Sequence, residues 1–233
     1  MEAQKNVFIL SRSTVNLNVE QILKQMRLHG DTRRFSTVVH ELIEIVTPVA
    51  RPKALYKICC VNSQNPDFIE IDGVKFTGRL VMDNLAQAKR VFVCVATCGT
   101  EVEAVEIHAG DVIKRYCLDA IKLRLVISAS DYLQEHLAHQ YATGTLSSLN
   151  PGELSAFPVN QLRNLFSILG DVEGMIGVRL TKNCALIPAK SRAGIFFRSD
   201  TGFLSCRLCQ HPRCQERKAL YCSELALQYE SFP

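Results

Sequence analysis

Four cysteines lie close together near the C-terminal end of the chain, at Cys206, Cys209, Cys214 and Cys222, with the spacing C-x2-C-x4-C-x7-C. A C-x-x-C pair in a tight turn directs two thiolates at one point. Two further cysteines nearby can complete a tetrahedron around a metal ion or cluster. The segment between them is basic, and positive charge favours the thiolate, which is the ligating form. The pattern indicates metal or redox chemistry in this segment.

Two kinds of centre fit these residues. All four cysteines can hold an iron–sulfur cluster, and all four, or three of them with His211, can hold zinc. The spacing does not distinguish the metals, and the Cys-Pro ending of a bacterial ferredoxin motif is absent from the sequence. The alternative is four reduced cysteines that bind nothing. We predict a metal or cluster site.

The composition is that of a globular protein. The chain has 233 residues, 47% hydrophobic and 21% charged, and can bury a large core. A formal net charge of +4 does not by itself indicate nucleic-acid binding, and no apolar run reaches the roughly 20 residues of a membrane span. Ten cysteines without an N-terminal secretory signal are typical of reduced thiols. We therefore expect a cytoplasmic protein without nucleic-acid or membrane partners.

The first 50 residues have the period of two amphipathic helices. Asn18 and Gln21 form a capping-box pattern for the first helix, which we expect to end at Gly30. Ser36 is placed to cap the second helix, which must stop before Pro48.

From residue 54 the pattern changes to that of strands, predicted at 54–61, 68–71, 74–76 and 91–96. Asp72-Gly73 separates the second from the third and is a strong hairpin signal. After the fourth strand, Thr100 and Glu103 form a capping-box pattern for a helix.

The longest periodic stretch predicts one central helix from Asp111 to about Gln140, packed against a sheet. A loop at 143–157 leads to a helix that begins at Pro158 and ends at Gly170. Further strands are predicted at 176–180, 185–187 and 195–197. These elements predict an α+β domain over residues 1–200, with a mainly antiparallel twisted sheet packed with the long helix, and a Cys-rich tail at 201–233.

Four segments in the middle of the chain carry family information through their order. They are 95–102 (VATCGTEV), 110–121 (GDVIKRYCLDAI), 149–161 (LNPGELSAFPVNQ) and 176–194 (IGVRLTKNCALIPAKSRAG). Together they resemble the activation domain of cobalamin-dependent methionine synthase, and more closely its stand-alone relatives in anaerobic bacteria. The resemblance covers roughly residues 40–200.

The resemblance implies a subunit of a cobalamin-dependent methionine synthase-like methyltransferase system. In that family the domain binds S-adenosylmethionine and docks on a module that carries cobalamin. An electron from a reductant and a methyl group from S-adenosylmethionine then return inactive cob(II)alamin to methylcobalamin. The cofactor supplies the chemistry and the protein supplies position and electrostatics. The implied partners are a corrinoid methyltransferase and an electron-donor protein.

One motif departs from the family. The family's S-adenosylmethionine motif reads Arg-x-x-x-Gly-Tyr-Pro, and alignment on Gly152 places Ser148, Glu153 and Leu154 at the Arg, Tyr and Pro positions. An arginine offers a planar fork to a ligand carboxylate, and a serine does not replace it.

The resemblance places the ligand at Asn150, Pro151, Gly152 and Glu153. Gly152 permits a close backbone approach, and the helix N-terminus that follows favours a carboxylate. Either Arg163 or Arg179 replaces the missing arginine, or the chain no longer binds this ligand and the loop is an ordinary turn.

A second hypothesis is a non-catalytic interaction module that binds a metal or an iron–sulfur cluster on the same scaffold. The altered motif beside a complete set of cysteines motivates it. A zinc-ribbon-like nucleic-acid binder is a third possibility, against which the modest net charge and the lack of interleaved aromatic and basic residues argue.

Overall fold

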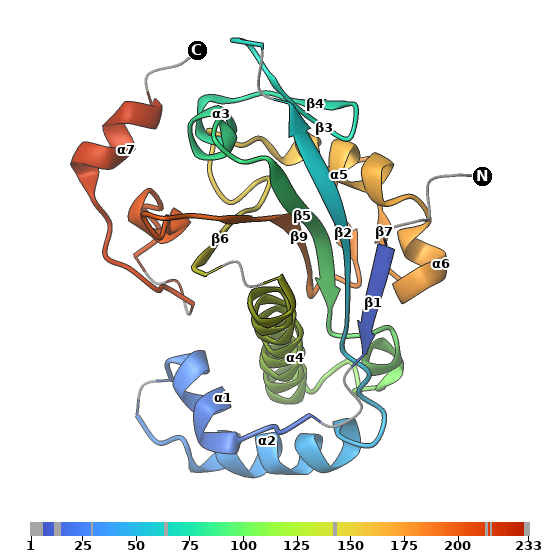
Figure 1. Cartoon of the computed structure of the whole chain (residues 1–233). Coiled ribbons are helices and arrows are strands. Elements are labelled where there is room, and N and C mark those ends of the chain that lie inside the picture. Colours follow the sequence, from blue (N-terminus) through green and yellow to red (C-terminus); the bar gives the residue numbers. More distant parts are fainter. Residues whose placement is uncertain are drawn as a thin grey trace.

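A sheet forms the centre of the molecule in the computed structural model, which describes residues 7–11, 15–28, 30–62, 65–141, 144–212, 214 and 216–230 (Figure 1). Its strand order is β4-β3-β2-β5-β9-β6, with β1 also paired to β2, and all of these pairs are antiparallel. The strands are β1 Val7–Ser11, β2 Lys53–Asn62, β3 Ile69–Ile71, β4 Val74–Phe76, β5 Arg90–Thr97, β6 Leu146–Leu149 and β9 Ser191–Arg198. A separate hairpin pairs β7, Arg179–Leu180, with β8, Leu186–Ile187.

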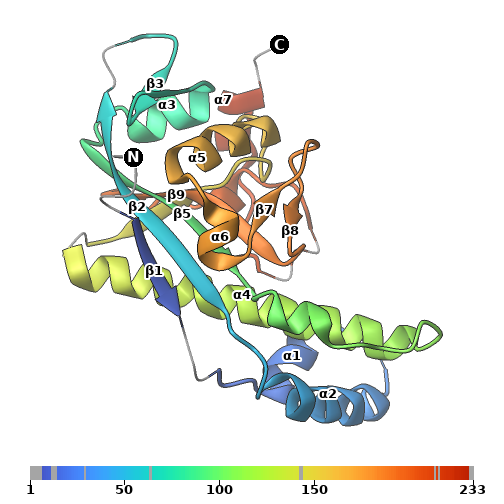
Figure 2. The same cartoon turned by 90° about the vertical axis from the view of Figure 1, so that its right-hand side faces the viewer.

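Helices cover both faces of the sheet (Figure 2). They are α1 Val19–Met26, α2 Arg33–Val46, α3 Arg79–Leu85, α4 Val112–Tyr141, α5 Leu162–Leu169, α6 Val172–Ile176 and α7 Ser223–Glu230. On one face lies α4, with α1 and α2 outside it, and on the other lie α3, α5 and α6. The predicted fold class, an α+β domain with an antiparallel sheet and a long central helix, is confirmed.

The alternation of side chains along β5 explains this layering. Val91, Val93 and Val95 point into the core shared with α3, α5 and α6. Phe92 and Cys94 point into the core shared with α1, α2 and α4. Successive side chains of a strand face opposite sides of a sheet, so a continuous apolar run requires cover on both.

The aromatic residue Tyr56 joins the C-terminal part of α4 to the sheet. Its hydroxyl lies 3.1 Å from Nε2 of His136 and 3.0 Å from the hydroxyl of Tyr141. Burial and the neighbouring Tyr141 hydroxyl raise the pKa of Tyr56 well above its usual value, so the phenol stays protonated. The contact fixes where the last turns of α4 cross the sheet.

Sequence signals at turns and caps are confirmed where a side chain or backbone angle decides them. Asn18 caps α1 by accepting a hydrogen bond from the Gln21 amide at 3.0 Å. Asp72 and Gly73 have φ of 47° and 81°, the left-handed pair that a type I′ hairpin turn needs.

Several predicted boundaries are wrong. The helix α1 ends at Met26, where Arg27 follows as the C-cap with φ 48°, and not at Gly30. The helix α2 begins at Arg33, where Asp31 accepts a hydrogen bond from the backbone amide, and not at Ser36. The capping pattern at Thr100 yields only a short 3-10 turn, Glu101–Ala104, without a side-chain cap.

Other differences concern whole elements. The predicted loop at 143–157 contains β6, and Ile176, predicted to begin a strand, ends α6, which Asp171 caps. The elements β1, α3 and α7 were not predicted at all. No helix in the described ranges combines the length and apolar character that a bilayer span needs.

The core position of α4 generates a stability prediction. Leu125 is fully buried, whereas Val112 on the same helix is 65% exposed. We expect Leu125→Ala to lower the free energy of unfolding by about 2–5 kcal/mol because it leaves a cavity. Val112→Ala should change it by less than about 0.5 kcal/mol. Urea unfolding measures both, and equal midpoints would contradict the assigned layering.

Candidate functional site

The loop that carries the altered motif folds back on itself. The amide of Gly152 donates to the carbonyl of Phe157 at 2.8 Å, and the amide of Glu153 donates to the carbonyl of Asn150 at 3.2 Å. Phe157 is fully buried in the core and anchors the end of the loop. The loop is therefore a fixed structure at the C-terminal end of β6.

Two glycines make this arrangement possible. Gly152 has φ +89°, which a residue with a side chain rarely adopts. A Cβ on Gly194 of β9 would lie 1.9 Å from Oδ1 of Asn150 and 2.8 Å from the carbonyl oxygen of Leu149. The start of the loop thus lies directly against β9.

Two of the four predicted loop residues contact each other, and one of them also contacts the tail. The side-chain amide of Asn150 donates to Oε1 of Glu153 at 2.7 Å. Oε2 of Glu153 accepts a hydrogen bond from the hydroxyl of Ser205 at 3.1 Å. Pro151 is buried, and Gly152 is exposed at the turn. The structure therefore brings the predicted loop and the Cys-rich segment together.

The arginine beside the loop is Arg192, whereas the sequence suggested Arg163 or Arg179. Arg163 on α5 donates to the carbonyl of Lys182, and Arg179 lies on β7. Arg192 on β9 lines a small cavity together with Ser148 and Asn150. The pairing of β6 with β9 creates this proximity, and no local sequence pattern predicts that pairing.

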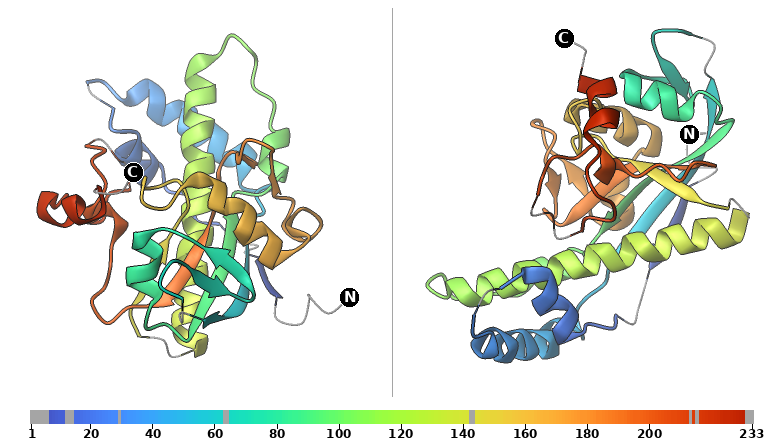
Figure 3. Two further views of the ribbon diagram at one scale, coloured as in Figure 1. Left: turned by 90° about the horizontal axis from the view of Figure 1, so that it is seen from above. Right: turned by 90° about the vertical axis from the view of Figure 1, so that its left-hand side faces the viewer.

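The tail crosses the β6–β9 side of the sheet and contacts three parts of the domain (Figure 3). Arg27 of α1 donates to the carbonyl of Cys214 at 2.8 Å, and Arg192 forms an ion pair with Glu216. The guanidinium of Arg79 on α3 lies 5.9 Å from the ring centroid of Tyr229 on α7.

One arginine organises the tail from inside. The guanidinium of Arg217 donates to four backbone carbonyls, two at 3.0–3.1 Å and two at 2.7–2.8 Å. They belong to Cys206, Ala219, Cys209 and His211. A planar guanidinium suits such convergent acceptors. The tail therefore has a defined course although it contains little regular secondary structure.

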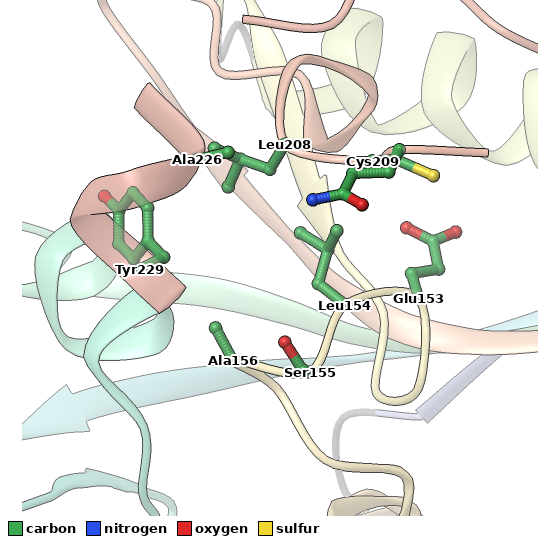
Figure 4. A pocket seen from close by; sticks show the side chains of 9 residues that line it. Glu153, Leu154, Ser155, Ala156, Leu208, Cys209, Ala226 and Tyr229 are labelled. Atoms are coloured by element: carbon green, nitrogen blue, oxygen red, sulfur yellow. The ribbon is translucent and has the colours of Figure 1, made fainter. Parts of the chain in front are cut away.

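The four tail cysteines are free and partly exposed. Sγ of Cys206 accepts a hydrogen bond from the amide of Lys218 at 3.4 Å. Cys209 and Glu153 both line a cavity of about 360 Å³ between the loop and the tail (Figure 4). Across the described ranges, no three Cys, His, Asp or Glu side chains are grouped as ligands of one metal ion. The metal site stays a prediction.

Cysteines outside the tail are mostly core residues. Burial raises the pKa of Cys94 and of Cys98 to about 12 and that of Cys117 to about 11. Burial also raises the pKa of Cys59, and the neighbouring Asp72 carboxylate adds to this increase. These groups are protonated at neutral pH, and a protonated thiol is a poor nucleophile and a poor ligand.

Comparison with known proteins supports the fold. No protein-family model matches this sequence, and no curated protein matches it significantly. Among solved structures, the chain is similar to the MetH reactivation domain in a crystal structure of that domain bound to AdoHcy. The TM-score is 0.57 at 15% sequence identity, over 83% of this chain and 79% of the other. The likeness establishes a common fold.

Thiol accessibility gives a prediction that separates the two groups of cysteines. We expect iodoacetamide to label Cys60 and Cys209 and to leave Cys94, Cys98 and Cys117 unlabelled up to about pH 9, because buried thiols with raised pKa values hold almost no thiolate there. Peptide mass spectrometry measures the labelling. The urea-unfolded protein is the control, in which all cysteines should react. Labelling of Cys94 in the native protein would contradict the assigned burial.

Proposed function

We propose that this chain acts in the cytoplasm as a reactivation subunit of a corrinoid-dependent methyltransferase. It would dock on the cobalamin module of a separate partner and support reductive methylation of cob(II)alamin with S-adenosylmethionine. The observation that carries the proposal is the likeness, over 83% of the chain, to the MetH reactivation domain bound to AdoHcy.

The site residues fit the part of a positioning protein. The corrinoid belongs to the partner, and its cobalt would accept the electron and the methyl group when the two proteins meet. The contribution of this chain would be to hold the adenosyl ligand and the partner. The loop at Asn150, Pro151, Gly152 and Glu153 is fixed and lies beside two cavities, of about 360 Å³ and about 70 Å³. Such a rigid frame is what the orientation of a methyl donor requires.

We further propose that Cys206, Cys209, Cys214 and Cys222 bind zinc or an iron–sulfur cluster. Support comes from their spacing, their partial exposure and the amide hydrogen bond to Sγ of Cys206. Amide donors to cysteine sulfur orient thiolate ligands and tune their basicity. Binding would require the cysteines to move closer together than in this structure.

The alternative function is a non-catalytic metal- or cluster-binding interaction module. The observation that favours it is the bond between Ser205 of the tail and Glu153 of the loop, which places the tail over the altered motif. In this alternative, the tail would block the loop at residues 150–153, and the domain would serve only to bind its partner.

Docking is tested with a methionine synthase cobalamin module loaded with cob(II)alamin. We expect an immobilised chain to retain the loaded module. A chemical reductant with S-adenosylmethionine should then convert the cob(II)alamin spectrum to that of methylcobalamin faster than without the chain. The module without corrinoid is the control for non-specific retention. Absence of both retention and spectral change would exclude the reactivation role.

Metal content tests the tail. Anaerobically purified protein should contain on the order of one zinc ion or one cluster per chain, measured by elemental and acid-labile sulfide analysis. The double variant Cys206→Ser, Cys209→Ser should lose most of it. Cys60→Ser, which alters an exposed cysteine of β2, is the matched control and should retain it. Equal metal content in the three proteins would contradict the site.

A further inference from the structure

Two neighbouring cavities share three charged residues in their lining. Asp131 of α4, Arg192 of β9 and Lys218 of the tail line both a cavity of about 510 Å³ and a narrower one of about 70 Å³. The larger cavity lies among α1, α4, β9 and the tail, and the narrower one reaches Ser148 and Asn150. The two cavities are thus neighbours, and together their lining residues extend from the altered motif to α1.

Positive charge predominates in the larger cavity. Six basic residues line it with two acidic ones: Lys24, Arg27, Arg124, Arg192, Arg217 and Lys218, against Asp131 and Glu216. Arg27 and Arg217 donate to tail carbonyls, and Arg192 pairs with Glu216. Within the part of the chain that the structure describes, the side chains of Lys24, Arg124 and Lys218 have no hydrogen-bond or ion-pair partner. The cavity therefore favours an anionic group.

Strand register explains why Arg192 can act beside the motif. Residues 192, 194 and 196 of β9 lie on one face of the sheet, and Ser148 of β6 pairs with Phe196 on that face. Gly194 stands between Arg192 and Phe196, and the side chain of Asn150 lies against it. Arg192 of the neighbouring strand thus lines the same cavity as Ser148, the residue that stands at the position of the arginine in the family's motif.

The tail occupies this guanidinium with a carboxylate of its own. The side chains of Arg192 and Glu216 are 37% and 23% exposed, so the pair is only partly open to solvent. A carboxylate on a guanidinium is the contact that an amino-acid ligand would make. Glu216 therefore stands where the carboxylate of such a ligand would bind.

We propose that these two cavities bind the α-amino-acid end of a small-molecule ligand, with the ligand carboxylate on Arg192 and the ligand ammonium on Asp131, and that Glu216 competes for Arg192. The inference rests on the proposed function and gives its adenosyl ligand a contact that Ser148 does not provide. The larger cavity has the volume of a ligand site, which is typically about 300–1,000 Å³. The ligand binds by displacing Glu216, so binding and the position of the tail are coupled.

Isothermal titration of the full-length chain tests the inference with two probes. S-adenosylhomocysteine carries the amino-acid end, and adenosine lacks it. We expect S-adenosylhomocysteine to bind at least about tenfold more tightly than adenosine, since charge-assisted hydrogen bonds contribute most of the difference. Equal affinity for the two probes would overturn the assignment of the amino-acid end.

Variants separate the two residues. Glu216→Gln removes the competing charge and should tighten S-adenosylhomocysteine binding by about three- to tenfold. Arg192→Gln should weaken it by at least about tenfold. The matched controls are Glu103→Gln, from the ion pair with Lys122, and Arg198→Gln, from the same strand, and both should bind as the unaltered chain does. Circular dichroism verifies that each variant is folded.

The outcomes are decisive in both directions. Tighter binding by Glu216→Gln together with weaker binding by Arg192→Gln supports the inference. Unchanged affinity in either variant, or no binding by any variant, overturns it. Retention of the cobalamin module, measured on the same proteins without the adenosyl ligand, reports on docking separately. A failed ligand site is therefore distinguishable from a failed reactivation role.

Discussion

A strand whose two faces are both apolar has to be covered on both sides, and β5 imposes that requirement on this chain. Its alternate side chains divide the interior into two cores, one under α4 and one under α3 and α5. Burial of apolar surface on both faces supplies most of the stabilisation available to such a layered domain. The strand β9 pairs with β5 along six residues and therefore lies between the same two cores.

The candidate site lies where β9 meets the edge strand β6 and where this regularity stops. Gly194 leaves room for the loop that begins at Asn150, and Arg192 lines a cavity beside that loop. The tail then covers the exposed end of the sheet through polar contacts with Glu153, Arg192 and Arg27. The core thus supplies a rigid frame, and the polar contacts of the tail lie at its open end.

The sequence predicted those elements that local physics determines. The period of α4 and the left-handed requirement at Asp72-Gly73 can be read without knowledge of the partner elements. The four-residue strand β6 carries two serines and no strong period, so only its pairing with β9 makes it a strand. Arg192 was missed for the same reason, because its role depends on a neighbouring strand. The order of the tail depends on Arg217 and carbonyl oxygens, which leave no compositional signature.

Hydrogen bonds from the Arg217 guanidinium to four carbonyl oxygens hold the main chain of the tail in a defined shape. Small metal-binding modules commonly owe their conformation to the ion, and collapse when a chelator removes it. Here Arg217 already restrains the backbone, and the four cysteines form no disulfide. Under the proposal that the cysteines bind a metal, the ion would be gained or lost by side-chain rotation and small loop shifts, while the tail stayed attached to the domain.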